Sequence, residues 1–422
     1  MPTATSLRTD PSHAMLHKLH YNVKAFGAVG DGTTDDTTAI TSAISAAFTA
    51  HQPVFFPAVA VNYKVTSTID LTPYRGTVLL GEGSRQGVNG QLGRGSNIGA
   101  ASSVSPIFKW DGDGNSAGLR FENLGFGDPE CAIRISDSAN VEFKNCAFSV
   151  SNTAGANNCC VLLENMFWVW FEDCHFNAPS TTTGEASVIL RGKEPSVNAD
   201  HCYLISFKRC RFWNNGVYYR DQNDIAVDAT HAEAIYFEDC DTENFDSGSA
   251  LIEFTKTAST NWGGRYVKNL MLKNVNHYDF VGSPANVRFS VPNGINTFVV
   301  ENIGGGIRLF ERNSGAAGLF RGFITGVENI YPFKDGSGTN LDYFSVVACD
   351  NSVNIGGPEW GNARINFVPT ASTVASIMAA AGAPENVVTA NVGSLYLRTD
   401  GGAGTSLYVK QTGSGNTGWV GK

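Results

Sequence analysis

The residues FENLGF at 121–126 recur, with variation, six more times along the chain. The later copies are FKNCAF (143–148), FEDCHF (171–176), FKRCRF (207–212), FEDCDT (237–242), LKNVNH (272–277) and VENIGG (300–305). Successive copies begin 22 to 36 residues apart. A repeat with this period is typical of a solenoid in which each copy forms part of one coil, and the extra residues of longer intervals form loops that leave the coils.

Three positions of the repeat are apolar in almost every copy. The first position holds Phe121, Phe143, Phe171, Phe207, Phe237, Leu272 and Val300. Two residues earlier stand Leu119, Val141, Val169, Ile205, Ile235, Leu270 and Phe298. The fourth position holds Leu124, Cys146, Cys174, Cys210, Cys240, Val275 and Ile303. Because side chains alternate between the two faces of a strand, we expect these positions to be buried. The four cysteines are interpreted as small apolar fillers, rather than disulfides or nucleophiles.

The second position of the repeat alternates in charge. It holds Glu122, Lys144, Glu172, Lys208, Glu238, Lys273 and Glu301. Equivalent residues of successive coils in a parallel β-solenoid stack about 4.8 Å apart, so opposite charges attract by roughly 0.2–1 kcal/mol per pair. The alternation therefore predicts that the seven copies are consecutive coils in register, and it assigns these glutamates a structural role.

The third position predicts a tight corner. It holds Asn123, Asn145, Asp173, Arg209, Asp239, Asn274 and Asn302. Asn and Asp tolerate left-handed backbone and form stacked side-chain ladders. The repeat as a whole thus predicts an all-β protein, a parallel β-helix.

The N-terminal segment 21–48 predicts a cap for the solenoid. A short strand and a glycine-rich turn precede Asp35 and Asp36, either of which is suited to begin a helix. The apolar residues of that helix share one face; they are Ile40, Ala43, Ile44, Ala47 and Phe48. The end of a solenoid needs such a cover. The sequence GAVGDG at 27–32 lacks the GK[ST] ending of a phosphate-binding loop, so nucleotide binding is not expected.

The same segment resembles a known superfamily. NVKAFGAVGDGTTDDTTAI (22–40), VFFPAVAVNYKV (54–65) and GTVLLGEG (76–83) are similar to the opening of pectate-lyase-like proteins, which include many phage tailspikes. With the repeats, the resemblance covers roughly residues 21–365. It implies a right-handed parallel β-helix that is often trimeric and often acts as a polysaccharide hydrolase or lyase. The NTD, GHG and RIK motifs of polygalacturonases are missing in their usual arrangement, so pectin is not the predicted substrate.

The C-terminal part has a different pattern. The alanine-rich residues 371–381 predict a helix, and 393–422 predict two alternating strands joined by a glycine turn. This ending resembles a short β-module found at the ends of phage tail proteins, which implies trimerisation. We divide the chain into 1–20, a tail or virion anchor; 21–100, the first coils and their cap; 101–365, the parallel β-helix; and 366–422, a C-terminal helix and β-hairpin module.

Composition excludes several classes of protein. The net charge of -9 offers no basic stripe for nucleic acid. No apolar run has the length of a signal peptide or a membrane span, so neither export by a leader nor membrane insertion is expected. The nine cysteines lack the spacing of a metal site, and no metal or cofactor is predicted.

Candidate catalytic and binding residues cluster between the 207 and 237 repeats and just beyond. Glycoside hydrolysis usually needs two carboxyl groups, and sugar rings stack on aromatic side chains. The catalytic candidates are Asp221, Asp224, Asp246 and Glu253, and the substrate-binding candidates in this region are Trp213, Tyr218, Tyr219 and Arg220. The alternative is a solvated loop or a contact between subunits.

Trp168 and Trp170 form a second candidate surface. Phe167, Val169 and Phe171 alternate with them and are expected to point inward, so both tryptophans should be exposed. Paired exposed aromatic residues indicate a binding surface, either for a glycan or for another subunit.

These observations favour a phage tailspike that binds and depolymerises a host capsule or lipopolysaccharide. We expect a homotrimer attached to phage tail or baseplate proteins through its N-terminus, made in the host cytoplasm and acting, in the virion tail, at the host cell surface. The alternatives are a catalytically inactive receptor-binding fibre and a bacterial polysaccharide-degrading enzyme. Two features disfavour the bacterial enzyme: a signal peptide is not evident, and the C-terminal module resembles those of phage tail proteins.

Overall fold

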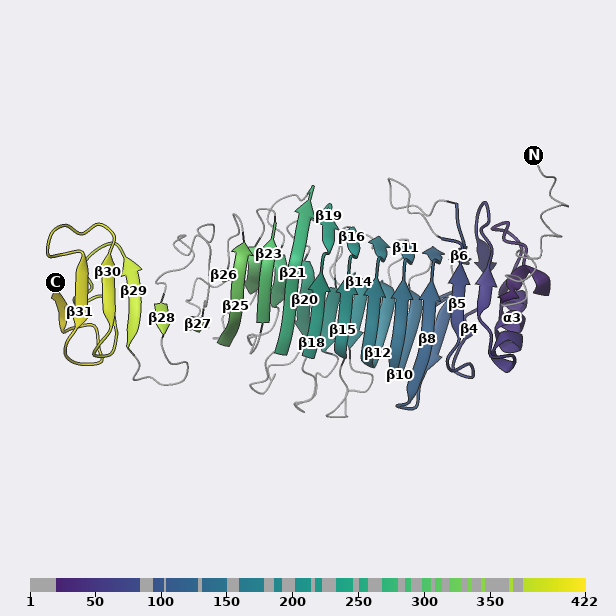
Figure 1. Ribbon diagram of the computed structural model, residues 1–422, viewed down its shortest axis with the longest axis horizontal. Coiled ribbons are helices and arrows are strands. Elements are labelled where there is room, and N and C mark those ends of the chain that lie inside the picture. Colours follow the sequence, from purple (N-terminus) through teal and green to yellow (C-terminus); the bar gives the residue numbers. More distant parts are fainter. Residues whose placement is uncertain are drawn as a thin grey trace.

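The computed structural model describes residues 20–83, 94–101, 104–127, 131–149, 159–177, 186–191, 202–213, 217–221, 233–245, 250–256, 268–279, 285–289, 298–304, 308–312, 319–327, 333–335, 343–345, 364–366 and 375–422. They form an elongated right-handed parallel β-helix with helix α3 at its N-terminal end and a separate small sheet at its C-terminal end (Figure 1). The predicted fold class is confirmed.

Three faces of parallel strands build the β-helix. The first face consists, in order, of β4 (Ile69–Asp70), β7 (Phe108–Asp111), the first part of β10 (Cys131–Lys144), the first part of β12 (Cys159–Glu172), β14 (Ala186–Arg191), β17 (Val217–Asp221), β20 (Ala250–Lys256), β22 (Ala285–Phe289), β24 (Arg308–Arg312) and β26 (Phe333–Asp335). The second face consists of β1 (Tyr21–Asn22), β2 (Val54–Phe56), β5 (Val78–Gly81), β8 (Ser116–Glu122), the later parts of β10 and β12, β15 (Tyr203–Lys208), β18 (Glu233–Glu238), β21 (Lys268–Tyr278), β23 (Phe298–Ile303), β25 (Leu319–Val327) and β27 (Tyr343–Ser345).

The third face is the shortest. It consists of β3 (Tyr63–Val65), β6 (Asn97–Ala100), β9 (Gly125–Gly127), β11 (Ala147–Ser149), β13 (His175–Asn177), β16 (Arg211–Trp213), β19 (Asp241–Glu243) and the end of β21. All described pairings within the β-helix are parallel except for one isolated bridge between Val59 and Gly95.

The apolar columns of the repeat fill the core. The rings of Phe121, Phe143, Phe171, Phe207 and Phe237 stack in sequence with centroids 4.7 to 5.0 Å apart. A second stack on the third face holds Phe126, Phe148, Phe176 and Phe212. The four repeat cysteines are free and buried between the stacks, as predicted. Such continuous burial is the main source of stability in a solenoid.

The charged column stacks as the alternation predicted. Lys144 pairs in register with both Glu122 and Glu172, and the same register continues to Glu301. Lys208 Nζ lies 3.1 Å from the Glu238 carboxylate, and Lys273 Nζ lies 3.5 Å from it on the other side.

The corner column is left-handed throughout. Its seven residues have φ between 49° and 59°. Asn145 Nδ2 donates to Asn123 Oδ1 at 2.6 Å, and Arg209 replaces an amide in the ladder by donating from Nε to Asp173. The corner is therefore fixed by side-chain hydrogen bonds between coils as well as by backbone preference.

Helix α3 (Thr37–Thr49) caps the N-terminal end of the β-helix, with the 3-10 helix η1 (Val23–Phe26) before it. Four of the five predicted apolar residues are buried, whereas Phe48 is 38 % exposed and packs its edge on Tyr74. Asp36 occupies the N-cap position, but its carboxylate accepts the N–H groups of Val29 and Gly30 instead of the helix N–H groups. The Asp36 carboxylate therefore holds the glycine-rich turn against the start of the helix.

The C-terminal module differs from the prediction in one element. Ser376–Ala380 form strand β29, not a helix, and pair with β28 (Arg364–Asn366) and β30 (Leu395–Arg398). Helix propensity of the alanines is outweighed by the alternating burial of Ser376 and Met378 in a sheet. The two predicted strands are β30 and β31 (Leu407–Lys410), and β32 (Trp419–Gly421) is a third. Among the described residues, no helix is long and apolar enough to cross a membrane.

Candidate functional site

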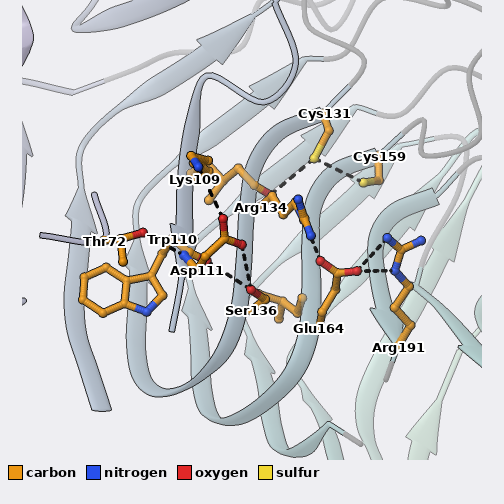
Figure 2. Close-up of polar contacts among 12 residues, drawn as sticks. Thr72, Lys109, Trp110, Asp111, Cys131, Arg134, Ser136, Cys159, Glu164 and Arg191 are labelled. Carbon is orange, nitrogen blue, oxygen red and sulfur yellow. Dashed lines mark hydrogen bonds and ion pairs between the residues drawn. The ribbon is translucent and has the colours of Figure 1, made fainter. Parts of the chain in front are cut away.

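The outward side of the first face carries a polar network at its N-terminal half (Figure 2). Lys109 on β7 lies 3.1 Å from the carboxylate of Asp70 on β4 and 3.3 Å from that of Asp111. Asp111 Oδ1 accepts a hydrogen bond from the Ser136 hydroxyl of β10 at 3.0 Å. Each contact joins residues of one coil or of neighbouring coils.

Glu164 lies at the centre of this network. Arg134 of the preceding coil donates from Nε to Glu164 Oε2 at 2.6 Å, and Arg191 of the following coil donates from Nε to Oε1 at 2.8 Å. The side chain of Glu164 is only 3 % exposed, that of Arg191 11 %, and that of Arg134 36 %. Both oxygens of the Glu164 carboxylate thus accept charge-assisted hydrogen bonds from guanidinium groups, and Arg134 is the more exposed of the two arginines.

The groups around Asp111 favour its ionised form. Burial raises the pKa of Asp111, but the Ser136 hydroxyl and the cations Arg134 and Lys109 together lower it below its usual value. The contact with Asp70 raises the pKa of Lys109. Fixed ionised groups of both signs can orient sugar hydroxyl and carboxylate groups, but these groups do not supply a neutral acid.

The register extends the site toward the C-terminal coils. Lys109, Arg134, Leu162, Ile189, Tyr218, Glu253 and Arg288 occupy one column, and Asp111, Ser136, Glu164, Arg191, Arg220 and Thr255 occupy the neighbouring one. Arg191 and Arg220 therefore occupy consecutive positions of one column.

Part of this outward surface is apolar and covered. Leu162 and Ile189 are buried, and they form a cluster with Ala186 and the paired thiols of Cys131 and Cys159. The two sulfur atoms are 3.6 Å apart and unlinked. The polar network thus borders a buried apolar cluster on the same face.

Two of the four predicted catalytic residues lie on described strands of the first face. Glu253 is half-buried on β20, in register between Tyr218 and Arg288. The backbone of Asp221 ends β17 and pairs with Lys256. Asp224 and Asp246 lie outside the described residues.

The predicted binding residues occupy different columns and faces. Tyr218 and Arg220 share columns with the polar network, whereas Tyr219 shares the column of the buried Leu190. Trp213 lies on β16 of the third face, in register with Asn177 and Glu243.

Trp168 and Trp170 lie near and on the second face, beyond the corner that follows Glu164. They are 45 % and 44 % exposed, as predicted. The prediction that Phe167 points inward is wrong: it is half-buried, and Met166 is buried in its place. Positive φ at Asn165 and Trp168 interrupts the alternation.

Sequence reasoning missed the residues of the polar network, Asp111, Arg134, Glu164 and Arg191. They belong to no repeated phrase, and their intervals of 23, 30 and 27 residues become meaningful only once the strands are in register. In the part of the chain that the structure describes, no cluster of His, Cys, Asp and Glu is arranged to hold a metal ion.

A family model described as rhamnogalacturonase A/epimerase, pectate lyase-like, matches residues 20–248, which are more than half of the 422-residue chain. The chain belongs to this pectate-lyase-like family. The match begins at the capping segment and includes the whole polar network. A comparison with curated proteins gives no significant match.

Solved structures similar to this pectate-lyase-like chain have low sequence identity. ORF18 of Geobacillus virus E2 is 15 % identical, with 98 % of this chain and 88 % of that protein covered and a TM-score of 0.46. The tailspike of Acinetobacter phage vB_ApiP_P1 is 15 % identical, with coverage of 85 % and 66 % and a TM-score of 0.49. Endo-xylogalacturonan hydrolase of Aspergillus tubingensis is 15 % identical, with coverage of 78 % and 98 % and a TM-score of 0.45.

Proposed function

We propose that this chain is a phage tailspike that binds a host surface polysaccharide on the outward side of the first face and depolymerises it. The observation that carries the proposal is the ion-paired triad of Arg134, Glu164 and Arg191. Burying the charges of Glu164 and Arg191 is costly, and an apolar set of the same volume often gives equal or greater stability. On the second face, by comparison, neighbouring coils are joined by partly exposed Lys–Glu pairs. We therefore interpret the triad as built for recognition.

Membership of the pectate-lyase-like family supports a polysaccharide as the ligand. A row of outward charges along stacked coils also fits a chain of repeated sugar units better than a single small molecule, because both extend along one axis. The partly exposed Arg134 suits an acidic group of such a glycan.

Glu253 is the proposed catalytic carboxylate. Its register position between Tyr218 and Arg288 gives it an aromatic neighbour and a cationic neighbour, the residue types that hold a sugar ring and stabilise charge. Asp221, Asp224 and Asp246 remain the candidates for its partner.

Depolymerisation is tested by release of reducing ends from purified host polysaccharide. We expect release by the wild-type protein and a loss of at least 100-fold in Glu253→Gln, whereas Glu238→Gln in the charged column should retain the wild-type rate. Mass spectrometry of the products then separates a lyase, which leaves an unsaturated sugar, from a hydrolase. Full activity of Glu253→Gln would exclude this assignment.

A catalytically inactive receptor-binding fibre is the second candidate. One observation favours it: the three carboxylates of the described network, Asp70, Asp111 and Glu164, are each ion-paired, so each would have to leave a cationic partner to act on a substrate. Binding of host glycan without any release of reducing ends would support this candidate.

The proposed tailspike acts as a homotrimer in the virion tail. Support for the trimer comes from an aliphatic face on the C-terminal sheet, made of Ile377, Ala379, Leu395, Leu397, Leu407, Val409 and Val420. These residues occupy two adjacent rows of the sheet, and Leu397 and Val420 are 46 % and 39 % exposed. The opposite side is covered by Val388 and Ala390, so a second and third copy are the proposed cover of the aliphatic face. Attachment to tail or baseplate proteins through residues 1–20 remains part of the proposal; residues 1–19 lie outside the described residues.

A further inference from the structure

Five aromatic residues gather outside three consecutive coils, where β12, β15 and β18 enter the second face. We name this group the aromatic platform; it consists of Phe167, Trp168, Trp170, Tyr203 and Tyr236. The rings of Phe167 and Tyr203 have centroids 6.5 Å apart. Trp170 is in register with Ser206, and Ser206 with Tyr236 on the next coil. The two tryptophans are almost half exposed, and the other three residues are half-buried.

Trp168 is placed in an unfavourable conformation. Its φ is 57°, in the left-handed region that bulky residues rarely adopt. The equivalent corners of other coils are occupied by Asn140, Leu204, Ala234 and Asn269, all with positive φ. Asparagine accepts this backbone readily, so a tryptophan there adds both backbone strain and apolar exposure. Because Trp168 is unfavourable for folding in both its backbone conformation and its exposure, it points to a role in binding.

The rim of the aromatic platform is charged, and its charges already pair with one another. Arg120 Nε lies 3.3 Å from Glu142, the neighbour of Trp170 in its column. Lys144 Nζ lies 3.7 Å from Glu172, two residues beyond Trp170. A subunit interface over the platform would desolvate these pairs, and the centres of such interfaces are depleted of charge. A sugar ring, by contrast, would cover only the indole faces and leave the charged rim in contact with water and with the sugar hydroxyl groups.

We propose that the aromatic platform is a second carbohydrate site, which stacks the apolar face of a hexopyranose ring and is separate from the polar network of the first face. It rests on the proposed function, since it holds another part of the same polysaccharide. Glu164 and Trp168 belong to one strand, four residues apart, so a glycan that leaves the first face reaches the platform around a single corner.

The test measures binding of the full chain to immobilised bacterial capsular polysaccharides and lipopolysaccharide O-chains by biolayer interferometry. The variant Trp168→Asn/Trp170→Ser introduces the residue types that the same columns carry at Asn269 and Ser206, so the fold should be kept. We expect its Kd to rise at least tenfold and its melting temperature to stay equal or increase. The matched control is Tyr278→Ala, which removes another exposed aromatic side chain and should leave Kd unchanged.

Three results would overturn the inference. If the wild-type protein binds and the double variant binds with the same affinity, the aromatic platform is not a carbohydrate site, and the proposed function still stands. A change of molar mass in light scattering assigns the tryptophans to a subunit interface instead. Failure of the wild-type protein to bind every glycan of the panel contradicts the proposed function and the platform together.

Discussion

Glu164 and Arg191 lie on neighbouring coils of the first face, and Oε1 of Glu164 is 2.8 Å from Nε and 2.7 Å from Nη2 of Arg191. Arg134 approaches the other carboxylate oxygen from the preceding coil. One carboxylate therefore joins three successive strands, and the two guanidinium groups are held in fixed orientations. This arrangement couples the stability of the first face to the geometry of its proposed glycan site.

Removal of the shared carboxylate should destabilise the protein strongly. In Glu164→Ala, two cations on a largely buried surface lose their common anion, and we expect the free energy of unfolding to fall by about 3–5 kcal/mol. Glu238→Ala, in the more exposed charged column, should cost less than about 1 kcal/mol. Chemical denaturation of both variants checks the difference. Equal losses would show that Glu164 is no more than another surface ion pair.

The asparagine ladder should contribute through both its hydrogen bonds and its backbone. Asn274 Nδ2 donates to Asp239 at 2.7 Å, its Oδ1 accepts from Asn302 at 3.0 Å, and its φ is 51°. Asn274→Ala loses both bonds and places a less tolerant residue in left-handed backbone, at a cost of about 2 kcal/mol or more. Asn274→Gly loses the bonds without the backbone penalty and should be the more stable variant. A higher melting temperature for Asn274→Gly than for Asn274→Ala shows the backbone contribution, and equal melting temperatures would leave only the hydrogen bonds.

The repeat made the second face predictable, because one phrase carries the buried, charged and corner positions together. Phe143 and Lys144 can be assigned to opposite sides of a strand from period alone, and the alternation of charge then sets the register. The strand period gave a wrong prediction for Phe167, because the left-handed residues Asn165 and Trp168 interrupt the alternation of side chains in β12. Local propensity failed at Ser376–Ala380, where pairing with β30 outweighs the helix preference of alanine.

The candidate site was predicted only in part, for a physical reason. Neighbours such as Arg134 and Glu164 are brought together by stacking of coils whose loops differ in length, and no local pattern encodes that distance. Tyr218 and Arg220 were proposed because aromatic and charged residues gather between the 207 and 237 repeats, and Glu253 because it follows one coil later; all three stay predictions. The register then separated them from Tyr219 and Trp213.

His277 should make the β-helix sensitive to acid. It and Thr242 continue the column of stacked phenylalanines; the ring Nδ1 contacts Thr242 Oγ1, and Nε2 lies 2.9 Å from Asn286 Oδ1. Burial lowers the pKa of His277 to about 4, although the bond to Asn286 opposes the shift. Since the unfolded chain binds this proton near pH 6.5, stability is complete above that pH and declines toward pH 4, by up to about 3 kcal/mol.

Melting temperatures at pH 4.5 and 7.5 test this expectation. Burial also lowers the pKa of His175, which contributes in the same direction, so the wild-type difference alone does not isolate His277. His277→Gln removes the titration at that position, and the difference between the two pH values should shrink. A pH dependence identical to that of the wild-type protein would contradict the assignment.

The repeat cysteines should be inert in the folded protein. Cys146, Cys174, Cys210 and Cys240 are at most 1 % exposed, and burial raises the pKa of Cys174 and Cys240. A sulfur atom that the solvent cannot reach is not alkylated, because the reagent has no access to it. Iodoacetamide at pH 8 should therefore leave all four unmodified, and the same treatment in denaturant should modify them, as measured by peptide mass spectrometry. Rapid labelling of the folded chain would show that the core opens.

The aliphatic face of the C-terminal sheet should determine the oligomeric state. In Leu397→Lys/Val420→Lys, two charges replace side chains that the proposed trimer buries, so association should be lost while the internal core around Tyr396 and Trp419 is kept. Val387→Lys is the control, because Val387 is 74 % exposed and adjoins Val388, which packs on the opposite side of the sheet. Light scattering should show a trimer for the wild-type protein and the control, and a monomer for the double variant. A monomeric wild-type protein, or a trimeric double variant, would mean that the exposed leucine and valine are not what holds the subunits together.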